Sequence, residues 1–158
     1  MGENNNIELL EKLSLRVIEY LGDEVGLQVS DKFSIKNVEG VQSLYVSAII
    51  SISKDMCGTI GISVPKSMIA PITESLIFAK IEDSEIEEYA EDTISEVLNI
   101  ILANVVQNLT VIKNGGEVKI TTPSIVRNRE ELQKNKDCQM YISELNVNNE
   151  KVLLSYHF

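Results

Sequence analysis

Three polar residues in the middle of the sequence have types and a spacing that could do hydrolytic chemistry. Asp92, Glu96 and Asn99 follow one another at intervals of four and three residues, which places them on one side of an α-helix. A carboxylate can dock a cation or transfer a proton, and a neutral amide can hold a water molecule through its carbonyl oxygen. The only histidine, His157, is interpreted as a strand surface residue, so acid–base chemistry would depend on carboxylates.

The helix that must position these residues is the longest periodic segment, residues 83–109. At 100° per residue its core side carries Ala90, Ile94, Val97, Leu98, Ile101, Val105 and Leu109. Within about 60° on the opposite side lies a stripe of four residues, which are Asp92, Glu96, Asn99 and Ala103. We expect this stripe to be accessible, with the small Ala103 allowing close approach of a partner.

The start of this helix and its asparagines bear on that interpretation. Asp83 or Ser84 is predicted to cap the first turn, where acidic residues suit the helix dipole. A polar helix face usually does no more than meet water. Asparagine is nevertheless a poor helix former, and it occurs at positions 99, 104 and 108. Because the whole chain is rich in Asn, Ile and Lys, this composition favours a functional face only mildly.

The composition limits the classes of partner and site. A formal net charge of −10 disfavours nucleic acid and anionic membranes, and no segment has the roughly 20 apolar residues of a membrane span. The polar N-terminus does not resemble a signal peptide, so a cytoplasmic protein is expected. Cys57 and Cys138 lack metal-ligand spacing and are expected to pack as small apolar residues. No cofactor of its own and no metal site are predicted.

The remaining elements follow from hydrophobic periodicity. Residues 7–21 have the pattern of an amphipathic helix, and residues 27–35 that of a strand or strand pair. Residues 44–64 have the pattern of a hairpin, in which Gly58 and Gly61 could mark a bulge or a close backbone approach. A short helix at 68–78 follows, and a strand at 117–121 comes after the long helix. A charged loop is predicted at 127–137, then two terminal strands joined at Asn148-Asn149. The prediction is one α+β (mixed α/β) domain over residues 1–158, with a mostly antiparallel sheet packed against long helices.

The pattern Asp92-x-x-x-Glu96-x-x-Asn99, continued through Ala103 and followed by Pro123, resembles the signature of the CheC/CheX chemotaxis phosphatases. The segment 58–66 also looks like the strand and turn that enter the first short helix of this family. The resemblance covers residues 56–126 well and the rest by element order. Family members with two sites carry the motif twice, and the predicted helix 7–21 has no Glu-x-x-Asn. The resemblance is therefore to a CheX-like, single-site member.

Two departures from the family pattern affect packing more than chemistry. Ala103 stands where a glycine is common, and the gap from Asn99 to Pro123 is about one residue off the usual spacing. Neither departure removes a polar group.

The resemblance implies a function in two-component signalling. The substrate would be the aspartyl phosphate of a CheY-type response regulator, which holds its own Mg²⁺ and lysine. Asn99 would orient the attacking water, Glu96 would dock to the receiver lysine, and Asp92 and Ala103 would contact the partner. It also implies a homodimer, for which the terminal strands could supply an edge.

Two other interpretations stay open at this point. The chain could be a non-catalytic receiver-binding or flagellar-switch-type module of the same fold. It could also be an unrelated α/β domain with a coincidental motif, in which case an exposed Glu96/Asn99 stripe need not exist.

Overall fold

The structure is a computed structural model that describes residues 2–127, 131–133 and 136–158. Its helical elements are α1 (Gly2–Glu19), a π-helical turn η1 (Tyr20–Glu24), η2 (Lys66–Met68), α2 (Ile69–Ile77), η3 (Asp83–Glu85), α3 (Ile86–Gln107) and α4 (Thr110–Lys113). Its strands are β1 (Val29–Val38), β2 (Gly40–Gln42), β3 (Val46–Lys54), β4 (Gly58–Val64), β5 (Val118–Ile120), β6 (Ser124–Arg127), β7 (Glu131–Gln133), β8 (Met140–Val147) and β9 (Glu150–His157). No helix in the described ranges is long and apolar enough to cross a membrane.

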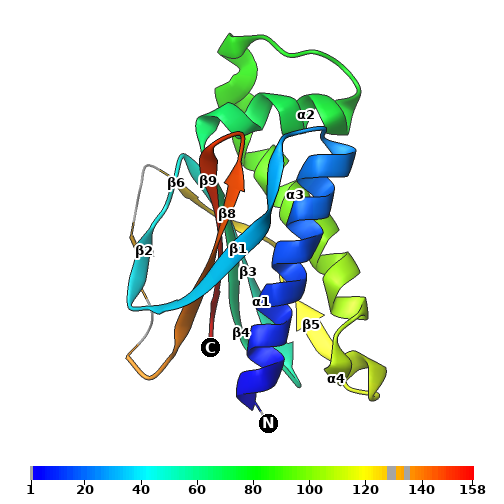
Figure 1. Cartoon of the computed structure of the whole chain (residues 1–158), viewed down its shortest axis with the longest axis vertical. Helices are drawn as coiled ribbons and strands as arrows, with labels where there is room; N and C mark the ends of the chain where they lie inside the picture. The colour runs from blue at the N-terminus through cyan, green and yellow to red at the C-terminus, as the bar shows by residue number, and fades with distance from the viewer. Residues whose placement is uncertain (1, 128–130, 134–135) are drawn as a thin grey trace.

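One antiparallel sheet organises the molecule. Its strands follow the order β1-β8-β9-β4-β3-β5, with β6 pairing along another part of β3, and β2 and β7 form a small second sheet. The α1 and α3 helices lie against one face of the large sheet, and α2 packs on α3 at one end (Figure 1). This is the predicted α+β class.

The core lies between the sheet and the helices because each element has one apolar side. All seven residues predicted for the core side of the long helix are at most 2% exposed. They meet alternate strand residues such as Ala48, Ile62 and Leu154. A buried helix face of this length determines the rotation of α3 about its own axis, and therefore which residues point outward.

Several predictions from the sequence are confirmed in detail. The β3–β4 hairpin forms, with Gly61 so close to β9 that an added Cβ would lie 2.6 Å from Ser155 Oγ. The Asn148-Asn149 turn has φ values of 51° and 62°, as a tight hairpin with two left-handed residues requires. The first turn of α2 accommodates Pro71, where no intrahelical N–H donor is needed.

Other expectations are wrong. The terminal strands β8 and β9 cannot supply a dimer edge because both lie inside the sheet, between β1 and β4. Arg127 belongs to β6 instead of a solvated loop, and β7 falls inside the predicted loop; residues 128–130 and 134–135 of that loop lie outside the described residues. Cys57 is exposed instead of packed in the core. Long-range pairing decided the positions of the strands, and local periodicity does not report it. Cys57 is exposed because it lies in the turn between β3 and β4.

Candidate functional site

The polar stripe of α3 is on the surface. Its four residues, Asp92, Glu96, Asn99 and Ala103, are all exposed, while the residues on the core side of the helix are buried. We call these four residues the α3 stripe. Neither Asp92 nor Glu96 forms an ion pair with any described residue. Glu96 and Asn99 are separated by about 4.5 Å of rise along the helix, so a single partner group can contact both. The side chains predicted to be functional are therefore brought together and available.

The N-terminal end of α3 is held by polar contacts from several elements. Glu82, and not the predicted Asp83 or Ser84, stands at the cap, and its N–H donates to the Glu85 carboxylate at 2.6 Å. The capping box is a local pair of reciprocal bonds between Glu82 and Glu85, and it satisfies two free first-turn groups where a single capping side chain would satisfy one.

A second contact at this end comes from β6. The Arg127 guanidinium donates to the Glu87 carboxylate and lies over the Tyr45 ring at 4.8 Å. The hydrogen bond from Tyr45 is the main cause of a lowered Glu87 pKa, and Arg127 adds to it. These contacts hold the start of α3 against β6 and against Tyr45, the residue before β3.

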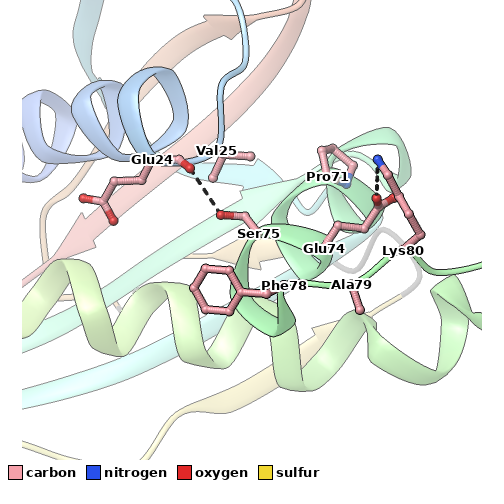
Figure 2. Close-up of a pocket in the computed structure, with 8 residues that line it drawn as sticks. All are labelled: Glu24, Val25, Pro71, Glu74, Ser75, Phe78, Ala79 and Lys80. Atoms are coloured by element: carbon pink, nitrogen blue, oxygen red, sulfur yellow. Dashed lines mark hydrogen bonds and ion pairs between the residues drawn. The ribbon is translucent and has the colours of Figure 1, made fainter.

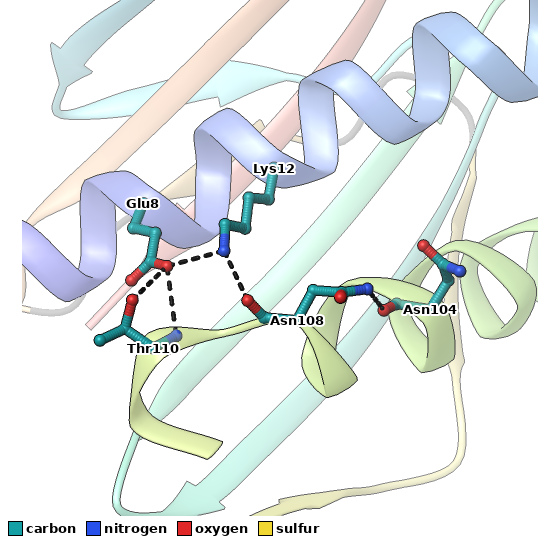
Figure 3. A network of polar contacts seen from close by, with 5 residues as sticks. All are labelled: Glu8, Lys12, Asn104, Asn108 and Thr110. Atoms are coloured by element: carbon teal, nitrogen blue, oxygen red, sulfur yellow. Dashed lines mark hydrogen bonds and ion pairs between the residues drawn. The ribbon is translucent and has the colours of Figure 1, made fainter. Parts of the chain in front are cut away.

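The opposite end of α3 is fastened to α1, as Figure 3 shows. The Lys12 ammonium donates to the Asn108 carbonyl at 2.5 Å, where the helix leaves its last carbonyls free. Glu8 accepts hydrogen bonds from Thr110 N at 3.2 Å and Thr110 Oγ1 at 2.8 Å, and it pairs with Lys12 at 2.9 Å. Burial alone would raise the pKa of Glu8, but the bonds from Lys12 and Thr110 outweigh it and lower that pKa. The helix that carries the stripe is thus positioned at both ends.

Sequence reasoning missed two residues that lie beside α3, Arg16 of α1 and Tyr20 of η1. Tyr20 is 2% exposed, and burial, with smaller contributions from Glu24 and Glu96, raises the pKa of its phenol to about 12. Arg16 pairs with Glu24 at 2.7 Å and lies over the Tyr20 ring. Within the described part of the chain, neither the Tyr20 hydroxyl nor Arg16 Nη1 has a hydrogen-bond partner. The sequence offered one sign of these two residues: an arginine and a tyrosine four positions apart, next to the apolar face of the first helix.

The first helix also contains a spacing that the predicted range did not. Because α1 begins at Gly2, it includes Glu3-x-x-Asn6. Asn6 Oδ1 accepts a hydrogen bond from the Tyr156 hydroxyl at 3.2 Å, so this amide is engaged in the fold. No described residue holds the side-chain amide of Asn99 in this way, which distinguishes the two positions.

The residues available for other chemistries are dispersed. Among residues 2–127, 131–133 and 136–158, no three His, Cys, Asp or Glu side chains are grouped so that they could hold a metal ion. His157 lies at the end of β9, and partial burial lowers its pKa. The α3 stripe is therefore the candidate site that the geometry favours.

The fold and the site together define a class of protein: an antiparallel sheet covered on one face by helices, one of which displays an acid–acid–amide stripe. Within that class, residues 46–146 match the model of the chemotaxis phosphatase CheX family, and the chain belongs to this family. No curated protein matches the sequence.

Solved structures share the fold. The chemotaxis protein CheX from Desulfovibrio desulfuricans has a TM-score of 0.75 at 16% identity, covering 94% of this chain and 97% of that one. A CheX–CheY–BeF3–Mg²⁺ complex from Borrelia burgdorferi gives 0.67 at 21% identity, covering 94% and 96%. FliY from Thermotoga maritima gives 0.56 at 10% identity, covering 98% and 90%. At these identities the likeness concerns the fold.

Proposed function

We propose that this protein hydrolyses the aspartyl phosphate of a CheY-type response regulator, with the α3 stripe as its site. In this reaction water attacks phosphorus, the bond between phosphorus and the aspartate oxygen breaks, and the products are inorganic phosphate and the free carboxylate. The observation that carries the proposal is the exposure of Glu96 and Asn99 one turn apart on a helix whose other side is buried. Membership of the CheX family supports it.

Asn99 is the residue that touches the chemistry. Its carbonyl oxygen can accept a hydrogen bond from the attacking water, and its NH₂ can donate to an oxygen of the phosphoryl group. A carboxylate at this position would repel the phosphoryl charge. Aligning the water supplies roughly 100-fold to 1000-fold acceleration, or about 3 to 4 kcal/mol of barrier. That is enough to turn off a signal whose acyl phosphate already hydrolyses in water.

Glu96 is the residue that docks the receiver. One turn before Asn99, its carboxylate can pair with the receiver lysine next to the phosphoryl group and so aim the amide. Asp92 extends the negative surface, and Ala103 leaves room for the receiver backbone. The receiver's own Mg²⁺ offsets the phosphoryl charge, so the proposal assigns this chain no cofactor of its own. We expect the reaction to take place in the cytoplasm.

The test is a phosphate-release time course with each CheY-type receiver encoded in the same genome, phosphorylated with acetyl phosphate. Asn99→Ala is expected to abolish stimulated release while receiver binding stays largely intact. Asn104→Ala is the matched control, because Asn104 is an exposed asparagine of the same helix outside the stripe. Normal turnover by the Asn99 variant would remove the mechanism.

Glu96→Ala is expected to weaken both receiver binding and phosphate release, because docking precedes chemistry. Glu88→Ala is its control, since Glu88 is exposed two turns earlier on the same helix. Equal effects of the two substitutions would mean that general negative charge, and not a specific docking contact, attracts the receiver.

The alternative function is a non-catalytic receiver-binding or flagellar-switch-type module. The fold likeness to FliY is the observation that favours it. A chain that binds a phosphorylated receiver without accelerating phosphate release would establish the alternative and exclude the phosphatase.

We further propose that the protein works as a homodimer, as its CheX-like character implies. In the described part of the chain, β1 is an edge strand of the large sheet, since it pairs with β8 alone. An edge strand offers free N–H and C=O groups for pairing with a second copy. Sedimentation equilibrium would test this: a monomer at micromolar concentration contradicts it.

A further inference from the structure

The most exposed large apolar side chain of the described residues is Phe78, at the C-terminal end of α2. Phe78 is 93% exposed, and the preceding Ile77 is 44% exposed. Phe78 also has left-handed backbone angles, φ 55° and ψ 37°. Its ring projects from the end of the helix instead of turning back to the core (Figure 2).

The fold itself does not account for a phenylalanine at this position. Left-handed angles at a helix end ordinarily select glycine or asparagine, because a bulky side chain strains them. An aromatic ring at such a position usually contributes through apolar contact, but this ring faces water over nearly its whole surface. A bulky ring at left-handed angles and its exposure to water both make folding less favourable, so we look for the function of this side chain in contact with another molecule.

Phe78 lies at the end of the molecule that carries the Asp92–Glu96 part of the stripe. Thr73 of α2 and Thr93 of α3 share a 2.6 Å hydrogen bond, which places α2 directly beside Asp92's turn of α3. Phe78 follows Thr73 by five residues, about 7 to 8 Å along a helix axis. The Ser75 hydroxyl donates to the Glu24 carbonyl at 3.3 Å, which joins the same end of α2 to η1.

A hollow of about 610 Å³ opens beside Phe78, and Figure 2 shows the residues that line it. Its apolar walls are Val25, Pro71, Phe78 and Ala79. The two carboxylates on its rim are both ion-paired, Glu74 with Lys80 at 2.8 Å and Glu24 with Arg16 at 2.7 Å. Asp92 and Glu96 add two exposed carboxylates nearby on α3. Unlike the carboxylates on the rim, Asp92 and Glu96 have no ion-pair partner among the described residues. The surface is therefore an apolar projection and hollow with uncompensated negative charge on its α3 side, and its complement is an apolar pocket with a basic side chain next to it.

We infer that Phe78 anchors the receiver, inserting its ring into an apolar pocket next to the lysine that Glu96 contacts. This inference rests on the proposed function, since the partner is the same receiver. Charge complementarity selects that partner: the receiver lysine is basic, whereas the same surface of a second copy would bring its own Asp92 and Glu96 against these two carboxylates. An exposed aromatic beside such contacts has the properties of an interface hot spot.

The experiment separates affinity from turnover. Phe78→Gly and Phe78→Asn both suit left-handed angles, so their melting temperatures are expected to be equal to or above that of the parent chain. In the phosphate-release assay, each is expected to raise KM for the phosphorylated receiver roughly 10- to 100-fold, with kcat unchanged at saturation. The affinity for the same receiver activated with BeF3⁻ is expected to fall by the same factor.

Ile120→Ala is the matched control, because Ile120 is an apolar residue of β5 that is 40% exposed. This substitution is expected to leave KM unchanged. An unchanged KM in the Phe78 variants, with active parent protein, would overturn this inference alone. A parent protein that neither binds nor dephosphorylates any receiver would overturn the proposed function, and this inference with it. Loss of self-association in the Phe78 variants at unchanged KM would assign the ring to a homodimer and overturn it as well.

Discussion

The threonine pair between α2 and α3 offers a sharp test of how the site is positioned. Thr73 and Thr93 are 1% and 3% exposed, and their hydroxyls share a 2.6 Å hydrogen bond. Valine has nearly the shape of threonine, so Thr73→Val or Thr93→Val leaves one buried hydroxyl without its partner. Such an orphan costs about 1 to 3 kcal/mol. A threonine in a helix can turn to the carbonyl four residues earlier, which lowers the expected cost to about 1 to 2 kcal/mol.

The double variant is expected to recover most of this loss, because two apolar groups of the same shape replace the pair. Urea denaturation followed by circular dichroism measures all four proteins. In thermal melts of the same proteins, each kcal/mol of lost stability corresponds to a decrease in Tm of about 2 to 4 °C for a chain of this length. A double variant as unstable as the sum of the two single variants would refute the reasoning, since it would mean that the hydroxyls do not act on each other.

Three further predictions concern residues that stabilise the fold. Glu8→Gln is expected to lower the free energy of unfolding by about 1 kcal/mol at pH 7, because the charge that accepts the hydrogen bonds of Thr110 is lost. Since the folded pKa of Glu8 is lowered, this difference is present above the ordinary carboxyl pKa of 4.5 and should vanish as pH falls through the folded pKa. Denaturation at several pH values would show this. Gly61→Ala places a methyl group 2.6 Å from Ser155 Oγ and is expected to cost about 1 to 3 kcal/mol, which adding Ser155→Ala should largely restore in thermal melts. Asn149→Gly, at φ 62°, is expected to raise Tm slightly, and a lower Tm would contradict the assigned turn.

The sequence by itself determined the elements whose residues carry a periodic pattern. In α3, the spacing of apolar residues predicts both that a helix forms and which of its faces points to the core, because the opposite face must then be exposed to water. The exposed positions of Glu96 and Asn99 therefore followed from their neighbours Val97 and Leu98. The β3–β4 hairpin and the Asn148-Asn149 turn were equally readable, since strand alternation and left-handed turn residues are local properties.

Only the tertiary structure decided which distant segments meet. The interior positions of β8 and β9 depend on pairing with β1 and β4, whose partner residues are 90 to 118 positions away in the sequence, and no local pattern encodes that choice. The same holds for Arg127. In the sequence it has the pattern of a charged loop residue, whereas in the fold it forms an ion pair with Glu87 of α3. Phe78 shows the limit most clearly: its type suggests a core residue, and its exposure arises because α2 ends there with its apolar side already buried on α3.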